Sequence, residues 1–529
     1  MTTLKIVTVE QMVEMEKQAA ALGLPSEILM ENAGLAVARE TKRWVGSLAG
    51  RHILILIGPG NNGGDGLVAA RHLHDWGADI HLYLPRPRPE SDPNYRLVQK
   101  RDIHIILADR PNSHAELESL LPSVGVVIDA LFGTGRARPM GEEIRRVLGK
   151  IREAKERDSR LQIVAVDLPS GLNADTGEID DACLTADVTI TLAYPKQGLF
   201  AFPGAARVGR LIVADIGIPT KLAEGISTEI VTTEGVRALL PERPLHANKG
   251  TFGRCLVVSG SINYIGAAYL ACAAAARVGA GLVTLAVARS LQPILASKLT
   301  EVTYIPLPEA EPGVIAASAS EVLRPELANY DALLLGCGLG QSHSTVEFVK
   351  SLLFSSSDLP SLILDADALN ILARITHWWL EMNRDAVLTP HPGEMSRLTG
   401  LSVQRVQSKR LSVAREAAVS WHKTIVLKGA YSLVVSPDGR IRVNPVANPG
   451  LASAGTGDVL AGAIAGLAAQ GLTLFDAAMT GTFLHGQAGE MVRIDMGDAG
   501  MIASDLLPVL PKVISRIKRG EAASGLMGG

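Results

Sequence analysis

The chain has 529 residues, which is too long for one ordinary hydrophobic core and therefore predicts two or more domains. It is rich in small and aliphatic residues and poor in aromatic ones, a usage typical of α/β sheets covered by closely packed helices. The formal net charge is −3, with acidic and basic residues interspersed, which argues against a nucleic-acid-binding protein.

Location and membrane association can be predicted from three features. The N-terminal stretch lacks the apolar segment of a signal peptide, which predicts a cytoplasmic protein. The uncharged stretch Cys255–Ala276 is long enough to cross a membrane, but the serines, glycines and asparagine in its middle favour a strand, a loop and a helix. The cysteines show no CxxC spacing and are interpreted as reduced core residues: Cys183, Cys255, Cys272 and Cys337.

Residues 1–225 alternate short apolar runs with helical patterns, as in a parallel, doubly wound α/β sheet. A helix is expected over Leu67–Trp76, closed by Gly77. The expected strands are His52–Ile57, Asp79–Leu84, Val124–Asp129, Gln162–Asp167, Val188–Ala193 and Arg210–Ala214.

Polar or glycine-rich loops follow three of these strands, at the edge where such sheets bind ligands. The run Gly58-Pro-Gly-Asn-Asn-Gly-Gly-Asp-Gly66 predicts a phosphate cradle, although it is neither GxGxxG nor a P-loop. The other loops carry Asp129 and then Asp167. Their oxygen atoms would suit a hard cation, and Arg136 and Arg138 could hold phosphates. The alternative is that each loop merely turns a strand into a helix.

These three motifs, in this order, resemble the NAD(P)H-hydrate epimerase domain, a Rossmann-like fold. The resemblance implies a potassium ion at Asn62, Asp129 and Ser170. Asp167 is our candidate for acid/base work in interconverting the R and S hydrates; the group that protonates the departing hydroxyl is left open. The residues implied to contact the hydrated nucleotide are Asn61, Asn62, Gly63, Gly64, Asp65, Gly133, Thr134, Gly135, Arg136, Ala137, Arg138, Pro139 and Asp167.

Residues 226–245 break the pattern and are expected to form a linker, and a second α/β series is expected over 246–529. Its last ten residues, from Gly520, are predicted to be a disordered tail. The expected strands are Cys255–Val258, Leu282–Val287, Ala332–Leu335, Leu362–Leu364 and Thr424–Leu427, followed by a hairpin that turns at Pro437-Asp-Gly439.

The stretch Asn448–Asp458 is small and flexible up to one carboxylate and then becomes an apolar, alanine-rich helical pattern. Gly455 and Gly457 would let backbone N–H groups approach an anion, and the helix start adds its positive dipole end. Asp458 would then lie beside a phosphate, where it could serve as a catalytic base. The alternative is an N-capped helix after a glycine-rich loop.

The second half resembles ADP-dependent NAD(P)H-hydrate dehydratase, which has a ribokinase-like fold. The motifs that carry the resemblance are Gly260–Ala268, Gly336–Gly340, Asp365–Asn370, Thr389–Glu394, Lys428–Ser432 and Asn448–Asp458, with Cys337 where the family is expected to have proline. The residues implied to bind the adenylate are Lys428, Gly429, Ala430, Tyr431, Ser432 and Gly457; those implied to line the hydrate site are Ala267, Gly338, His391 and the catalytic Asp458. Asp367 and Asn370 are weaker candidates for Mg²⁺.

As a whole the chain resembles the bifunctional NAD(P)H-hydrate repair family. The resemblance implies hydrated NADH or NADPH and ADP as substrates, K⁺ and Mg²⁺ as cofactors, and a homo-oligomer. One alternative is a ribokinase-like small-molecule kinase fused to a nucleotide-binding scaffold domain, because an anion loop that ends in Asp serves phosphoryl transfer equally well. His391 could instead be a turn histidine that bonds the backbone, and we interpret His422 and His485 as surface or satisfied residues.

Overall fold

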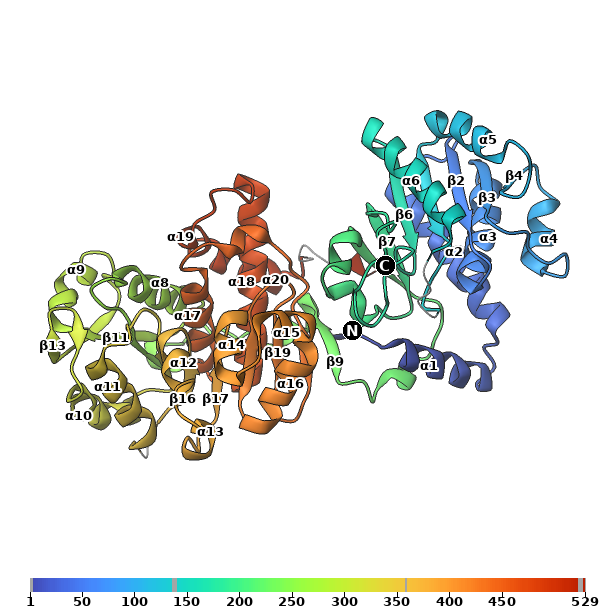
Figure 1. Cartoon of the computed structure of the whole chain (residues 1–529). Coiled ribbons are helices and arrows are strands. Elements are labelled where there is room, and N and C mark those ends of the chain that lie inside the picture. Colours follow the sequence, from blue (N-terminus) through green and yellow to red (C-terminus); the bar gives the residue numbers. More distant parts are fainter. Residues whose placement is uncertain (1–2, 136–139, 357–358, 522–526, 529) are drawn as a thin grey trace. The chain divides into compact units, whose positions relative to one another are not determined.

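The computed structural model describes residues 3–135, 140–356, 359–521 and 527–528. The chain divides into two compact units, each with its own large sheet (Figure 1). The N-terminal unit comprises Lys5–Ile226 together with the short strand β21 (Met527–Gly528). The C-terminal unit comprises residues 227–521 together with residues 3 and 4.

The N-terminal unit is a parallel sheet with helices on both faces, in the order β21-β8-β7-β6-β5-β2-β3-β4. Its strands are β2 (His52–Ile57), β3 (Asp79–Leu84), β4 (His104–Leu107), β5 (Val126–Ala130), β6 (Gln162–Val166), β7 (Val188–Leu192) and β8 (Arg210–Ala214). Its helices are α1 (Val9–Ala21), α2 (Ser26–Val45), α3 (Asn61–Asp75), α4 (Pro93–Gln99), α5 (Ser113–Leu120) and α6 (Glu142–Arg157).

Alternating side chains of β2 build two separate cores, because successive residues of a strand point to opposite faces. Ile53 and Ile55 belong to the core that includes residues of α2 and α3. Leu54 and Leu56 belong to the core that includes residues of α5 and α6. The sheet is therefore buried on both sides, as its continuous apolar strands predict.

The chain leaves β2 toward β3 and β4 on one side and then returns to β5, which pairs with the other side of β2. The direction of winding therefore reverses between β2 and β5. In doubly wound sheets ligands bind in the crevice at such a point, outside the carboxyl ends of the strands. This is where the loops after Ile57 and Ala130 lie.

The C-terminal unit has an eleven-stranded sheet in the order β1-β9-β20-β19-β18-β17-β16-β15-β10-β11-β12. It is parallel from β12 to β18, and β18, β19 and β20 are antiparallel neighbours. Its strands are β1 (Thr3–Lys5), β9 (Thr228–Val231), β10 (Arg254–Val258), β11 (Leu282–Ala288), β12 (Thr303–Leu307), β15 (Ala332–Leu335), β16 (Ser361–Leu364), β17 (Ala386–Leu388), β18 (Thr424–Leu427), β19 (Leu433–Val435) and β20 (Ile441–Val443); β13 (Glu309–Glu311) and β14 (Val314–Ile315) form a separate pair.

The helices of this unit include a buried pair, α8 and α17, that meet through small residues. A Cβ added to Gly462 of α17 would lie 2.1 Å from the carbonyl oxygen of Ala271 of α8, so only glycine permits this approach. The helices are α7 (Thr233–Leu239), α8 (Ile265–Arg277), α9 (Gln292–Ala296), α10 (Ala319–Leu323), α11 (His343–Phe354), α12 (Asp367–Leu372), α13 (Trp378–Glu381), α14 (Pro392–Thr399), α15 (Val403–Ser408), α16 (Arg410–Trp421), α17 (Thr456–Ala469), α18 (Leu474–Met496), α19 (Ala503–Leu506) and α20 (Leu510–Lys518).

The predicted α/β class is confirmed, with a parallel, doubly wound first unit and a second mainly parallel sheet. Strands β4, β12 and β17 were not predicted. Helix α3 begins at Asn61 rather than near Leu67, so the glycine run itself forms its first turns. The stretch 226–245, expected to be a linker, contains β9 and α7, and residues 527–528 of the expected tail form β21.

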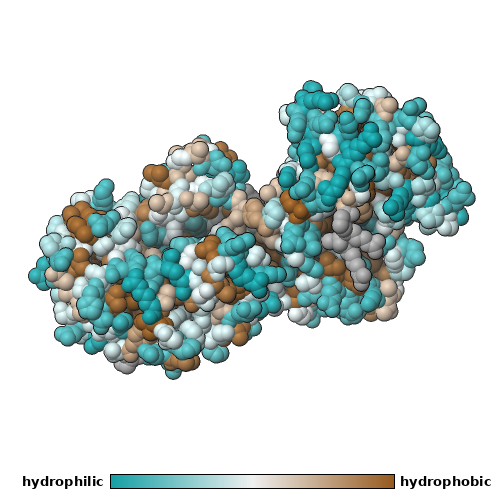
Figure 2. Space-filling model, in the orientation of Figure 1, coloured by the Kyte–Doolittle hydropathy of each residue, from teal (hydrophilic) through white to brown (hydrophobic). Residues whose placement is uncertain are grey.

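The stretch Cys255–Ala276 forms β10, a loop and α8, as predicted. Among the described residues, no helix combines the length and apolar character needed to cross a membrane. On the face drawn in Figure 2, hydrophobic residues lie in small groups among polar ones.

Candidate functional site

The first candidate site lies at the crevice between β2 and β5. Asp129, near the end of β5, is 1% exposed and accepts hydrogen bonds from the backbone N–H of Leu131 and from both the N–H and the hydroxyl of Ser170. Burial raises the pKa of the Asp129 carboxyl. Within the described part of the chain, no cationic side chain pairs with Asp129.

Asn62 and Ser170 complete this group around the loop that follows β5. The hydroxyl of Ser170 also accepts the N–H of Phe132 at 2.9 Å. A Cβ built on Gly133 would lie 3.0 Å from the side-chain oxygen of Asn62, so the amide packs directly on this loop. The Nδ2 of Asn62 is buried without a hydrogen-bond partner. The structure therefore brings the three predicted potassium ligands, Asn62, Asp129 and Ser170, to one place.

Asp167, the first residue after β6, forms a buried ion pair with Lys196. The Asp167 carboxylate also accepts the backbone N–H of Leu192 at 3.1 Å and lies 3.3 Å from the hydroxyl of Thr191. Its φ of +65° is uncommon for a residue other than glycine and is the kind of strain found at functional sites. Asp167 is thus fixed in its orientation by three donors.

Asp65 of α3 faces this ion pair and has no salt bridge within the described residues. Burial, with the negative charges of Asp167 and Glu16, holds its pKa well above the usual range, and Lys196 only partly offsets this. One cation therefore faces three carboxyl groups. Since Lys196 is hydrogen-bonded to Asp167, Asp65 is left without a cationic partner among the described residues, and its surroundings favour the protonated form of its carboxyl.

The remaining predicted residues of the first site lie on two loops and a helix start. Asn61 is exposed at the first position of α3, and Gly63 and Gly64 are buried in its first turns. A Cβ on Gly63 would lie 2.0 Å from the carbonyl oxygen of Gly58, which explains why glycine is needed there. Gly133, Thr134 and Gly135 belong to the loop after β5. Arg136, Ala137, Arg138 and Pro139 lie outside the described residues.

The second candidate site lies at the carboxyl edge of the C-terminal sheet. Lys428, directly after β18, donates to the carboxylate of Asp365 at 2.7 Å and lies 3.7 Å from that of Glu394. Burial works against the charge of Lys428, but the two carboxylates outweigh it and raise its pKa. Asp365 also accepts the hydroxyl of Thr389 at 2.7 Å.

Asp458 lies in the first turn of α17, as predicted, and faces this cluster. Its carboxylate oxygen, the sulfur of Cys337 and a carboxylate oxygen of Asp365 all lie within 4.8 Å of one another. Burial, followed by the charge of Asp365, raises the pKa of Asp458 to about 7. A carboxyl with this pKa can exchange a proton near neutral pH, which suits a general base.

The loops around Asp458 bring several predicted residues together. Gly338 touches α8, because a Cβ on it would lie 2.8 Å from that of Ala267. Gly455 has a φ of +87° and precedes α17, and a Cβ on Gly457 would lie 3.3 Å from the ammonium of Lys428. Residues Gly429, Ala430, Tyr431 and Ser432 form the turn between β18 and β19, closed by a hydrogen bond from the Ser432 hydroxyl to the Gly429 carbonyl at 2.8 Å.

The three histidines named in the sequence have ordinary structural contacts. His391 caps α14, where its Nδ1 accepts the N–H of Gly393 at 2.9 Å, and burial lowers its pKa. His485 is buried and bonds the carbonyl of Thr456 at 2.9 Å, and burial lowers its pKa to about 4. His422 is exposed at the end of α16. The Nε2 of His391 lies 3.4 Å from a carboxylate oxygen of Glu394, so both ring nitrogens have contacts within α14.

Asp367 and Asn370, the magnesium candidates, already accept hydrogen bonds. Asp367 accepts the N–H of Gly340 and the amide of Gln341, each at 2.8 Å, and Asn370 accepts the Nε of Arg397 at 2.8 Å. Because each carboxylate oxygen can accept twice, these contacts do not prevent cation binding. A cavity of about 520 Å³ adjoins them, lined by Gln341, Asn370, Ala373, Arg374 and Arg397.

Sequence reasoning assigned no role to Lys196, Asp365, Glu394 or the cavity arginines. Asp365 and Glu394 stand inside quoted motifs, next to residues that were assigned roles. Their signal was therefore present, but only the fold shows that both face Lys428. Lys196 follows β7 in a stretch with no glycine-rich or acidic motif, and nothing in the sequence points from it to Asp167.

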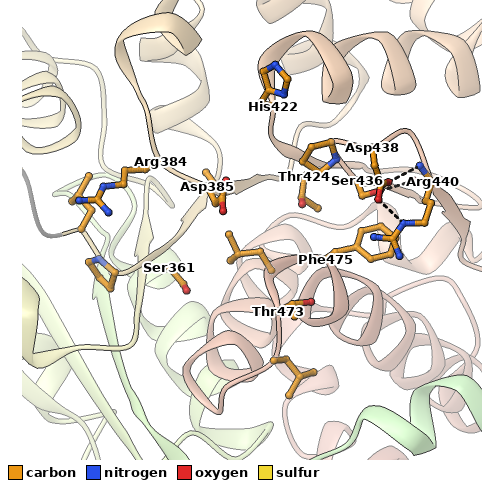
Figure 3. A pocket seen from close by; sticks show the side chains of 16 residues that line it. Ser361, Arg384, Asp385, His422, Thr424, Ser436, Asp438, Arg440, Thr473 and Phe475 are labelled. Atoms are coloured by element: carbon orange, nitrogen blue, oxygen red, sulfur yellow. Dashed lines mark hydrogen bonds and ion pairs between the residues drawn. The ribbon is translucent and has the colours of Figure 1, made fainter.

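A larger hollow of about 710 Å³ lies at the opposite edge of the C-terminal sheet (Figure 3). Ser361, Ala386 and Thr424, the first residues of three parallel strands, line it. The ion pair between Asp438 and Arg440, at 2.8 Å, forms part of its wall. It is therefore separate from the acidic cluster at the carboxyl ends of the same strands.

Two family models match the chain, one for each unit. A model described as NAD(P)H-hydrate dehydratase matches residues 255–512, and one described as YjeF-related protein N-terminus matches residues 26–198. The bifunctional NAD(P)H-hydrate repair enzyme Nnr of Moorella thermoacetica is 42% identical over 522 residues, which cover 97% of each chain. The enzyme of the same description from Thermofilum pendens is 38% identical and again covers 97% of each chain.

Among solved structures, the ADP/ATP-dependent NAD(P)H-hydrate dehydratase from Bacillus subtilis, co-crystallized with ATP/Mg²⁺, is 34% identical to the chain. The match covers 54% of this chain and 98% of that one, with a TM-score of 0.47.

Two α/β units, each with a cluster of buried acidic and basic groups at the carboxyl edge of its sheet, define a two-site enzyme. The chain belongs to the family of bifunctional NAD(P)H-hydrate repair enzymes. This confirms the family predicted from the motifs, together with its assignment as an enzyme that combines an epimerase domain with a dehydratase domain.

Proposed function

We propose that this chain repairs hydrated NADH and NADPH in two steps. The N-terminal unit interconverts the R and S hydrates at C6, and the C-terminal unit dehydrates the S form with ADP, releasing AMP and phosphate. The observation that carries the proposal is the position of Asp458, at the start of α17 and beside the Lys428–Asp365 pair. Family membership over nearly the whole chain supports the pairing of the two activities.

In the dehydratase unit, Asp458 would take the proton of the C6 hydroxyl as this oxygen attacks the β-phosphate of ADP. The phosphorylated hydrate then loses phosphate as the lone pair of the ring nitrogen forms a double bond to C6, and loss of a proton from C5 restores the C5=C6 double bond of the dihydropyridine. Lys428 and the N–H groups at the start of α17 would stabilise the negative charge on the phosphates. Asp365, paired with Lys428, would hold that ammonium in place.

Nucleotide binding is proposed for the loops nearest Lys428. Lys428, Gly429, Ala430, Tyr431, Ser432 and Gly457 would hold the adenylate, and Ala267, Gly338 and His391 would line the hydrate site. Arg374 and Arg397, which line the adjoining cavity, suit the diphosphate of the hydrate. Asp367 and Asn370 would hold Mg²⁺, which when bound neutralises phosphate charge.

In the epimerase unit, Asp65 would protonate the departing C6 hydroxyl, which leaves as water. The ring nitrogen then forms an iminium cation, which the Asp167 carboxylate stabilises. Water adds to the opposite face and gives its proton to Asp167, and proton exchange with solvent returns the two carboxyls to their starting states. Lys196 acts through Asp167, as a positioning residue that holds this carboxylate in its orientation.

The described residues fit a potassium ion in this unit. Asp129 is a buried carboxylate with hydrogen-bond donors but no cationic partner among them, and hard oxygen ligands suit such an ion. Asn62, Asp129 and Ser170 would hold it. When bound, it supplies the positive charge that the carboxylate lacks.

The test of the epimerase site compares Asp65→Asn and Asp167→Asn with Asp75→Asn, a change on the surface end of α3. The rate of R-to-S conversion is measured by chromatography of the two hydrates. We expect this rate to fall by roughly 10²-fold or more in the first two variants, the usual contribution of acid–base catalysis. The control should match the unmodified protein. An unchanged rate in Asp65→Asn would remove Asp65 from the mechanism.

We also propose that the protein acts in the cytoplasm and forms a homo-oligomer. All four cysteines are buried and free, which suits a reducing compartment. The oligomeric state is checked by light scattering of the purified chain.

A further inference from the structure

The amino-terminal edge of the N-terminal sheet carries a cluster of imidazole and carboxylate groups that the proposed function does not use. His52 and Asp79 are the first residues of β2 and β3, and they are register partners. His81 is the third residue of β3 and is the register partner of Leu54. Because residues two apart on a strand share a face, the three side chains lie on one side of the sheet.

The three donor atoms of this cluster are close to one another. The Nδ1 of His52 lies 2.9 Å from a carboxylate oxygen of Asp79 and 3.4 Å from the Nε2 of His81. The Nε2 of His81 lies 3.5 Å from the other oxygen of Asp79. A tetrahedral Zn²⁺ with bonds of about 2.0–2.1 Å places its ligand atoms about 3.3 Å apart. The two spacings made by the Nδ1 of His52, 2.9 and 3.4 Å, lie on either side of this value, and one donor atom from each of the three residues lies within 4.8 Å of the others.

The contacts of His81 leave its Nε2 able to accept a ligand. Its side chain is 14% exposed, and its Nδ1 is buried with no hydrogen-bond partner. Its Nε2 has neighbours only at 3.4 and 3.5 Å, longer than a good N–H···N or N–H···O bond. A cation in the cluster would bind at Nε2, the ring nitrogen that faces His52 and Asp79; the buried Nδ1 lies on the other side of the ring, outside the site.

The donor set decides which cation would fit. Two imidazole nitrogens and one carboxylate suit Zn²⁺ or a neighbouring transition metal, whereas Ca²⁺ and Mg²⁺ require oxygen ligands. Other titratable groups nearby are His104, whose ring lies 5.8 Å from that of His81, and Glu116, which holds His104 at 2.6 Å. His52 and Asp79 are 40% and 49% exposed, so a solvent molecule could fill the fourth position.

We propose that His52, Asp79 and His81 form a binding site for Zn²⁺ at the amino ends of β2 and β3. The site goes beyond the proposed function, because Asn62 and Asp129 lie at the opposite, carboxyl ends of β2 and β5. Six residues of strand separate the two edges, roughly 20 Å. The cation would join the beginnings of two neighbouring strands and stabilise the N-terminal unit without entering the reaction.

The experiment is a titration of the full-length, metal-free chain with Zn²⁺ by calorimetry, and with Co²⁺ by visible absorption. We expect one equivalent with the d–d bands of tetrahedral Co²⁺. His52→Gln and Asp79→Asn should each weaken binding at least 10–100-fold, because even residues that only support ligands have effects of this size. His422→Asn, which changes an exposed histidine of the other unit, should leave binding unchanged.

A second binding mode must be distinguished from this one. Cys337, Asp365 and Asp458 also lie close together, and Co²⁺ bound there would show a thiolate charge-transfer band. Binding that persists in His52→Gln, or that carries the thiolate band, would overturn the proposal. Epimerase activity should be equal in His52→Gln and the unmodified protein, so the failure of this site and the failure of the proposed function give different results.

Discussion

At the scale of single residues, the proposed mechanism depends most on Asp458. Its carboxyl must be ionised to accept a proton, and its pKa of about 7 lies well above the usual range because of burial and Asp365. The rate of dehydration should therefore be low at pH 5.5, rise through about pH 7, and level off above it. The measurement is kcat/KM against pH, from the return of absorbance at 340 nm. A profile flat from pH 5.5 to 8.5 would exclude Asp458 as the base.

Asp458→Asn should lower dehydration by roughly 10²–10⁴-fold, since the amide cannot take the proton. Epimerisation should stay nearly unchanged, because Asp167 and Asp65 belong to the other unit. The control is Asp438→Asn, a carboxylate at the opposite edge of the same sheet. Equal loss of both activities in folded Asp458→Asn would contradict a two-site enzyme.

Lys196→Met should lower both the stability and the activity of the N-terminal unit. It would leave the Asp167 carboxylate buried without its cation, which typically costs about 3–5 kcal/mol. The double variant with Asp167→Asn removes the buried charge as well. It should regain much of the stability, measured by urea unfolding, but not the epimerase activity. Regained activity in the double variant would show that the pair has only a structural role.

At the scale of elements, the contact between α8 and α17 positions Asp458. Gly462→Ala would place a Cβ 2.1 Å from the carbonyl oxygen of Ala271 and should destabilise the C-terminal unit by about 1–3 kcal/mol or more. Gly266→Ala, on α8 and with no atom within 4 Å of the added Cβ, should be neutral or stabilising by up to about 1 kcal/mol. Thermal unfolding checks both. Equal stability of the two variants would mean that α8 can shift away from α17.

Sequence patterns predicted the central strands well, because buried parallel strands are short continuous apolar runs, such as His52–Ile57 and Ala332–Leu335. They failed at β17, which has only three residues, at the partly exposed edge strands β4 and β12, and at the start of α3. At the start of α3, glycines that usually end helices are tolerated because Gly63 packs on the carbonyl of Gly58. The motif residues around Asp129 and Asp458 were predictable from loop chemistry. The pairing of Asp167 with Lys196 depends on two adjacent strand ends 29 residues apart, which no local pattern encodes.

At the scale of the whole molecule, the catalytic groups proposed for each step lie within one unit: Asp65 and Asp167 in the first, Asp458 in the second. A mixture of Asp167→Asn and Asp458→Asn chains should therefore repair both epimers, because the hydrate released by one chain can be used by the other. Recovery of absorbance at 340 nm from pure R hydrate, with each variant alone as control, checks this. No recovery from the mixture would mean that the two sites must belong to one chain.

The measurement that tests the two-step repair most directly uses the unmodified protein with a defined mixture of R and S NADPH hydrates, ADP, Mg²⁺ and K⁺. We predict that absorbance at 340 nm recovers beyond the S fraction, faster than spontaneous epimerisation allows, with release of inorganic phosphate. Recovery that stops at the S fraction would contradict an active first unit. A stable phosphorylated product without recovery would contradict the dehydratase and indicate a small-molecule kinase instead.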